Sequence, residues 1–119
     1  MPTLERTRAI PAETIEAAGL EIMKKAAIEI PRDYLDGIKA MQKTEQNELS
    51  RFVLQAMVEN WEVAEEDRRA MCADTGLPRY YVKAGNEAVI EGGFVALERA
   101  LRRATAEATH AIPLRPNRV

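Results

Sequence analysis

Residues 11–31, PAETIEAAGLEIMKKAAIEIP, carry apolar side chains at spacings of three and four. This spacing lines one face of an α-helix, and a proline at each end marks where such a helix can begin and end. The apolar positions are Ile15, Ala18, Ile22, Met23, Ala26 and Ile30. The stretch therefore predicts a helix that opens at Pro11 and closes before Pro31.

The same reasoning extends along the chain in both directions. Further helices are predicted at about 32–42, 45–69 and 94–108, with Thr44 as the N-cap of the longest one. The expected buried stripe of that helix comprises Leu49, Phe52, Val53, Ala56, Met57 and Trp61. Residues 79–84, RYYVKA, predict a short strand that ends at Gly85, and Gly76 is expected to adopt a positive φ. The predicted fold is mainly α with a small β element, a partial α+β domain.

The chain divides into four segments without any repeat or interdomain linker. An arm covers residues 1–10, and a helical N-terminal layer covers 11–69. A loop and strand follow at 70–85, and a helix with an extended tail occupies 92–119. We interpret 1–119 as one structural unit in the order helical layer, loop, strand and helix.

Composition excludes several classes of protein. The 119 residues include 17 Lys and Arg against 19 Asp and Glu, a formal net charge of −2, which disfavours binding to nucleic acid. No apolar run approaches the length that spans a membrane, so no membrane-spanning segment is expected. The sole cysteine, Cys72, cannot form an intrachain disulfide, which is typical of a cytoplasmic protein.

Three residues could carry chemistry, and each has an ordinary structural alternative. Cys72 is either a metal ligand or a small apolar side chain. Asp74 is either an acid–base group or the Asx residue of a turn. Arg115 lies between two prolines and could bind a carboxylate through its guanidinium fork or form a structural salt bridge. The simplest interpretation of His110 is a surface or capping residue.

Two motifs resemble a known family. Residues 71–76, MCADTG, followed by YVKAG at 81–85, resemble the Cys-x-Asp-Thr-Gly motif and next strand of iron–sulfur hydro-lyases. Ala104-Thr105 and residues 113–117, PLRPN, resemble the next landmark of that family. The family comprises class I fumarases and the alpha subunits of L-tartrate dehydratases. The similarity runs from about residue 52 to 119 and identifies the chain as the N-terminal part of such an alpha region.

The resemblance implies roles for these residues. Cys72 corresponds to the first of three cysteines that hold a 4Fe-4S cluster, which acts as a Lewis acid on the substrate. Asp74 corresponds to a catalytic acidic residue beside the substrate, and Arg115 to an arginine that binds a substrate carboxylate. The implied activity is reversible hydration and dehydration of a small hydroxy-dicarboxylate such as malate, fumarate or tartrate.

The chain departs from the family pattern at two points. Ala73 stands where many members have Gln or Asn, and the other two cluster cysteines are absent. We therefore expect the isolated chain to be inactive, and its partner to be a C-terminal remainder or a separate beta-type subunit, with the complete enzyme a homo-oligomer. The alternative is a free-standing helical interaction module in which Cys72 is structural.

Overall fold

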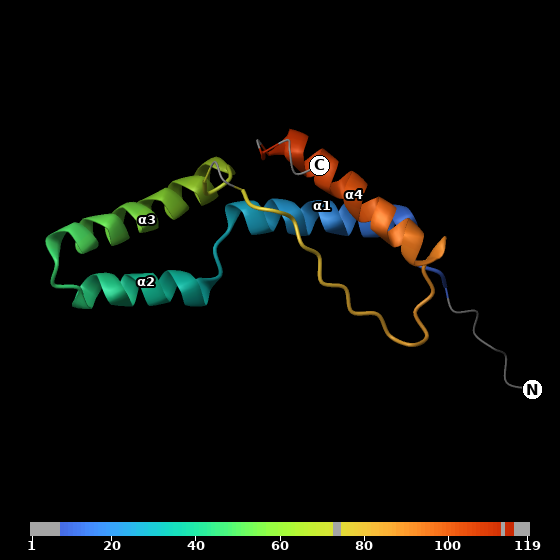
Figure 1. Ribbon diagram of the computed structural model, residues 1–119, viewed down its shortest axis with the longest axis horizontal. Coiled ribbons are helices and arrows are strands. Elements are labelled where there is room, and N and C mark those ends of the chain that lie inside the picture. Colours follow the sequence, from blue (N-terminus) through green and yellow to red (C-terminus); the bar gives the residue numbers. More distant parts are fainter. Residues whose placement is uncertain (1–7, 73–74, 113, 116–119) are drawn as a thin grey trace, which may run out of the picture.

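A computed structural model of the chain describes residues 8–72, 75–112 and 114–115. These residues form four α-helices, α1 (Ala12–Ile28), α2 (Arg32–Thr44), α3 (Glu48–Asp67) and α4 (Gly93–Ala111). An extended segment leads from residue 75 to the start of α4. Its first part lies beside the C-terminal half of α1, and the rest loops away from that helix (Figure 1). The prediction of a mainly α fold is confirmed.

Two prolines and one asparagine mark the starts of the first three helices. Pro11 and Pro31 occupy the N-cap positions of α1 and α2, where a missing N–H costs no helical hydrogen bond. The N-cap of α3 is Asn47, whose side chain accepts a hydrogen bond from the N–H of Ser50 at 3.0 Å. Thr44, the predicted cap, instead ends α2 and donates to the carbonyl of Met41 at 3.2 Å. The start of the third helix is thus three residues later than predicted.

Small residues let α1 and α4 pack closely against each other. Ala100, Ala104 and Ala108 on α4 are spaced by four residues and fully buried. A Cβ built on Gly19 of α1 would come within 3.1 Å of the Cβ of Ala104. At the far end of this helix pair, a core cluster contains Ile28, Ala108, Ile112 and Leu114.

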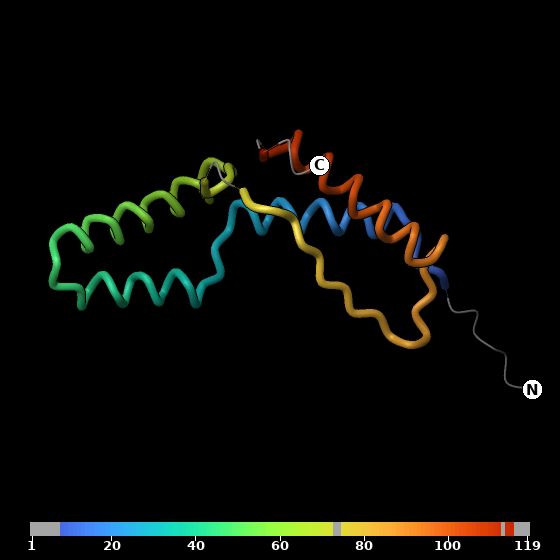
Figure 2. Tube along the Cα trace, in the orientation of Figure 1, coloured from blue at the N-terminus to red at the C-terminus, as the bar shows by residue number. Residues whose placement is uncertain are grey.

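The second pair, α2 and α3, forms a hairpin that extends away from the first (Figure 2). The molecule measures 72 × 35 × 21 Å, with a radius of gyration of 19.6 Å. A compact domain of this length has a radius of gyration of about 13.5 Å. The chain is therefore elongated, and the two helices of the hairpin pack mainly against each other.

The buried stripe predicted for the third helix is wrong. Leu49 and Phe52 are 72% and 69% exposed, and Val53 and Met57 are exposed as well. The buried residues of α3 are Leu54, Val58 and Ala64. Apolar side chains occupy two neighbouring sides of α3, and the adjacent helices cover only one of them, which the periodicity could not distinguish.

The prediction of a strand at residues 79–84 is also wrong. The described residues contain no strand, and the only pairing among them is an isolated parallel bridge between Ile10 and Ile90. Residues 79–84 are extended, but no segment among the described residues pairs with their backbone. The segment is held by a side-chain contact instead, in which the hydroxyls of Tyr80 and Thr105 lie 2.9 Å apart.

Candidate functional site

The loop that carries Cys72 begins where the C-terminal ends of α1 and α3 come together (Figure 1). Arg68 closes α3 in the left-handed conformation, with a φ of 54°, and turns the chain out of the helix. The N–H of Met71 then donates to the carbonyl of Ala27, on α1, at 3.1 Å. From the other side, the Asn60 side chain on α3 donates to the carbonyl of Met71 at 2.7 Å. The residue before Cys72 is therefore held by two helices.

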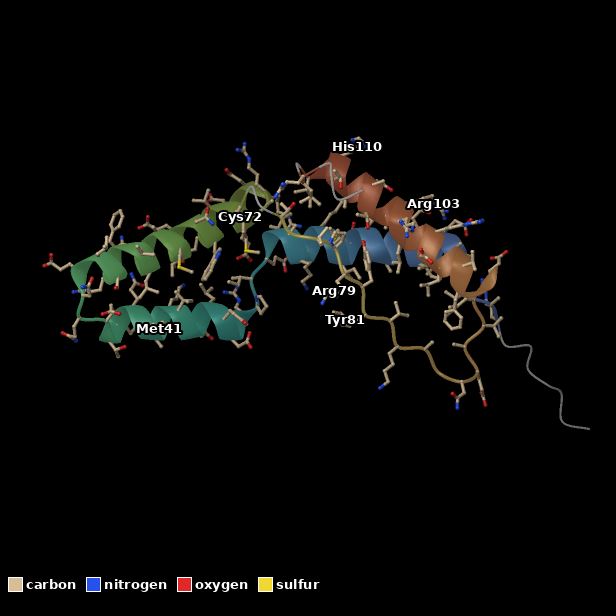
Figure 3. The ribbon with its side chains drawn as sticks, viewed as in Figure 1. Met41, Cys72, Arg79, Tyr81, Arg103 and His110 are labelled. Atoms are coloured by element: carbon tan, nitrogen blue, oxygen red, sulfur yellow. The ribbon has the colours of Figure 1, made fainter. Side chains whose placement is uncertain are left out.

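Cys72, which Figure 3 labels just beyond the end of α3, is exposed. It lines a cavity of about 350 Å³. One wall belongs to α1 and the rest to the loop, with Leu114 closing one side. The lining residues are Met23, Ala26, Ala27, Ala70, Met71, Cys72, Thr75, Gly76, Leu77, Pro78, Arg79 and Leu114. The cavity thus joins a thiol, a threonine hydroxyl and one guanidinium-bearing residue on an otherwise apolar surface.

The segment that carries Arg115 lies against the same loop. The backbone N–H of Arg115 donates to the hydroxyl oxygen of Thr75 at 3.2 Å, and the two residues are forty positions apart in the sequence. Gly76, next to Thr75, has a φ of 68°, so the predicted positive φ is confirmed. The two motifs that the sequence singled out are therefore neighbours in the fold, joined by Thr75.

Two parts of the predicted site lie outside the described residues. Ala73 and Asp74 are among them, so the proposed roles of Asp74 in catalysis and substrate binding stay predictions. Pro113 and Pro116, which flank the Arg115 segment, are outside as well. The structure thus places Cys72 and the backbone of Arg115, and Asp74 belongs to the same loop by sequence alone.

The residues present do not amount to a complete cluster site. Cys72 is the chain's only cysteine. Within residues 8–72, 75–112 and 114–115, no group of three or more His, Cys, Asp and Glu side chains is placed to hold a metal ion. A 4Fe-4S cluster needs several thiolate ligands. This chain therefore fits such a cluster as one ligand among several and cannot hold it unaided.

Two residues of this region were missed by sequence reasoning. Arg79 lines the cavity, whereas the sequence predicts only that it belongs to a strand. A basic residue directly after Pro78 is the only local signal of this position. Asn60 contacts the loop from the middle of a helix, and nothing in its sequence surroundings indicates that contact. His110 lies exposed in the last turn of α4 and is not part of the cavity wall, in keeping with a surface role (Figure 3).

A larger cavity of about 600 Å³ lies between residues 77–82 and α4. Its wall is mostly apolar, and its charged residues are Glu98 and Arg102, whose side chains pair with each other at 2.8 Å. It has neither a thiol nor a set of metal ligands. The smaller cavity at Cys72 is therefore the better candidate for chemistry.

None of the four helices in the described part of the chain combines the length and apolar character required to cross a membrane.

Comparison with known proteins gives the family. The family model described as fumarate hydratase (Fumerase) matches residues 16–119. "Putative L(+)-tartrate dehydratase subunit alpha" of Methanocaldococcus jannaschii is 32% identical over 98 residues, which is 82% of this chain and 34% of that protein. "L(+)-tartrate dehydratase subunit alpha" of Escherichia coli strain K12 is 31% identical over 90 residues, 76% of this chain and 29% of that protein.

This chain spans about a third of the length of these curated relatives. The matched region includes both motifs and all four helices except the first residues of α1. The resemblance carried by the Cys72 and Arg115 motifs is thereby confirmed, and the chain belongs to the fumarate hydratase (Fumerase) family.

Proposed function

We propose that this chain is a segment of an iron–sulfur hydro-lyase that adds water to, or removes it from, a small hydroxy-dicarboxylate of the fumarate, malate or tartrate type. One observation carries the proposal: in a chain of this family, the Thr75–Arg115 hydrogen bond brings the Cys72 loop and the Arg115 segment together beside one cavity. A metal-binding thiol and a carboxylate-binding arginine are what such a reaction needs within reach of one substrate.

In this proposal each residue has a distinct task. Cys72 supplies one of the thiolates that hold a 4Fe-4S cluster, and the cluster, when bound, supplies Lewis-acid chemistry for the departure or addition of water. Arg115 binds a substrate carboxylate through its planar guanidinium. Asp74 handles the proton that is transferred together with water. No step can proceed on this chain alone, because it lacks the other cluster ligands.

The missing ligands define the partner. A polypeptide with two further cysteines must complete the site, either as a C-terminal remainder of the same alpha region or as a separate beta-type subunit. The relatives are named as alpha subunits, which supports an enzyme built from more than one kind of chain. We place this enzyme in the cytoplasm, where a reducing environment protects an exposed thiolate from oxidation, and expect it to be a homo-oligomer when complete.

Anaerobic reconstitution with ferrous iron and sulfide tests the proposal. The chain by itself should retain little iron after desalting, whereas the assembly with its partner should bind a cluster and turn over malate, fumarate or L(+)-tartrate. In that assembly, Cys72→Ser should abolish both cluster absorbance and activity, because a hydroxyl is a far poorer ligand for iron–sulfur clusters than a thiolate. The matched control is Ala88→Ser, a serine introduced at an exposed position that lines neither cavity, which should change neither quantity. Full cluster content in Cys72→Ser would refute the assignment.

The exposed apolar side of α3 favours a second candidate, a helical interaction module without catalytic activity. Exposed apolar patches of this kind often mark a protein–protein interface. In that case, the assembly would form normally yet remain free of iron and inactive towards all three dicarboxylates. Iron content therefore separates the two candidates in a single preparation.

A further inference from the structure

Asn60 contacts the Cys72 loop from α3, the helix that directly precedes this loop in the sequence. Its side-chain amide lies 2.7 Å from the carbonyl oxygen of Met71, eleven residues later. A carbonyl oxygen can only accept a hydrogen bond, so the amide nitrogen of Asn60, and not its oxygen, must face it. The distance is at the short end of the range for an N–H···O bond.

The hydrogen bond acts on the peptide unit that enters Cys72. The carbonyl of Met71 and the N–H of Cys72 belong to one planar trans peptide, in which they point in opposite directions. Holding the carbonyl towards Asn60 therefore fixes the direction of the Cys72 N–H and the position of the Cys72 Cα. The preceding N–H, that of Met71, is bound to the carbonyl of Ala27 at 3.1 Å. Residue 71 is thus fixed through both of its peptide units.

Each of these two hydrogen bonds has a different character. The bond to Ala27 uses the C-terminal end of α1, which offers a backbone carbonyl whatever its side chains are. The bond to Asn60 depends on one side chain and disappears when that side chain is changed. Asn60 is therefore the part of this arrangement that a substitution can test.

We propose that Asn60 is a positioning residue that sets the backbone at Cys72 and so orients its thiol towards the cavity. What that thiol binds rests on the proposed function, but its orientation does not. A preorganised ligand loses less conformational freedom when a metal binds, so a fixed backbone favours metal binding by Cys72.

The single cysteine makes the proposal measurable on the intact chain. Alkylation by iodoacetamide reports on Cys72 alone, because there is no second thiol. Asn60→Leu replaces the amide by a side chain of similar size that cannot donate, and Asn60→Ala removes it altogether. Both substitutions should accelerate alkylation, because the released loop samples more reactive orientations of the thiol. The expected factor is about two- to tenfold, which corresponds to the free energy of one lost hydrogen bond. Amide hydrogen exchange of Met71 should accelerate by a similar factor.

Gln55→Leu is the matched control on the same helix. Gln55 donates to Glu59 at 2.7 Å, so this change also removes an exposed amide and its hydrogen bond, but at a distance from the loop. It should leave both rates unchanged, and helix content by circular dichroism should be equal in all variants. Wild-type rates in Asn60→Leu and Asn60→Ala would overturn the proposal, as would an equal acceleration in Gln55→Leu.

These outcomes are independent of the hydro-lyase assignment. Neither readout requires iron, sulfide, substrate or a partner chain. A failure to bind a cluster would therefore leave the positioning role of Asn60 intact, and unchanged thiol reactivity would leave the hydro-lyase proposal intact.

Discussion

The backbone N–H of Arg115 donates to the hydroxyl oxygen of Thr75 at 3.2 Å, which joins two segments forty residues apart in the sequence. Leu114, the preceding residue, is buried in the core at the end of α1 and α4 and also lines the Cys72 cavity. The Arg115 N–H thus attaches this segment to the loop, and the Leu114 side chain attaches it to the helices. This attachment determines which part of the chain lies beside Cys72.

Thr75→Val should weaken that attachment. Valine keeps the shape of threonine but has no oxygen to accept the Arg115 N–H, so the Arg115 amide should exchange with solvent about two- to tenfold faster. Thr75→Ser retains the hydroxyl and serves as the control, with exchange close to the wild-type rate. Equal exchange in both variants would mean that the hydroxyl does not hold the tail.

Arg115→Lys separates carboxylate binding from a structural salt bridge. Lysine keeps the charge but lacks the planar fork, so in the complete assembly the Michaelis constant for the dicarboxylate should rise while the melting temperature stays the same. The loss of one arm of a bidentate contact should cost about 1.5–3 kcal/mol of substrate binding. A lower melting temperature with unchanged kinetics would assign Arg115 to the fold and remove it from the active site.

The close approach of α1 to α4 predicts opposite effects for two helical glycines. A Cβ at Gly19 would lie 2.9 Å from Leu101 Cδ2 and 3.1 Å from the Cβ of Ala104, so Gly19→Ala should cost about 1–3 kcal/mol through overpacking. Gly37, in α2, has nothing within 4 Å of such a Cβ, and Gly37→Ala should stabilise the chain by about 0.5–1 kcal/mol. Urea denaturation of both variants measures the difference. Stabilisation by Gly19→Ala would show that the two helices are further apart than described.

The two apolar sides of α3 predict unequal costs for truncation. Leu54 is 9% exposed, and Leu54→Ala should lower the free energy of unfolding of the chain by about 2–5 kcal/mol. Phe52 is 69% exposed, and Phe52→Ala should change it by only about 0.5 kcal/mol. Denaturant titrations of the isolated chain check the ratio. The opposite order would restore the register in which Phe52 faces the core.

In the complete assembly, the cost of Phe52→Ala reports on what covers α3. If another polypeptide packs on that side of the helix, the same substitution should become several times more costly there, because a covered phenylalanine loses far more contact area when truncated. The comparison of one variant in two states requires no knowledge of the partner's structure. An equal, small cost in both would place Phe52 on a solvent-exposed surface of the enzyme.

Much of the helical architecture could be predicted because its causes are local. Pro11 and Pro31 delimit α1, and the spacing of apolar residues between them indicates the helix directly. The limits of α3 were less accessible, since Thr44 and Asn47 are both good capping residues and only one of them caps. The strand at 79–84 was predicted from local β propensity alone, whereas a strand requires a second segment to pair with, and the described chain offers none.

The amino-acid sequence by itself determined the four helices, the family and the identity of Cys72, Asp74 and Arg115 as candidate residues, since periodicity, capping and motif spacing are all properties of neighbouring positions. Only the tertiary structure decided that Leu54 rather than Phe52 is buried, that Thr75 binds the Arg115 segment and that Asn60 holds the peptide before Cys72. Each of these depends on which surfaces meet when helices pack. That outcome follows from contacts between distant segments, and no local pattern specifies it.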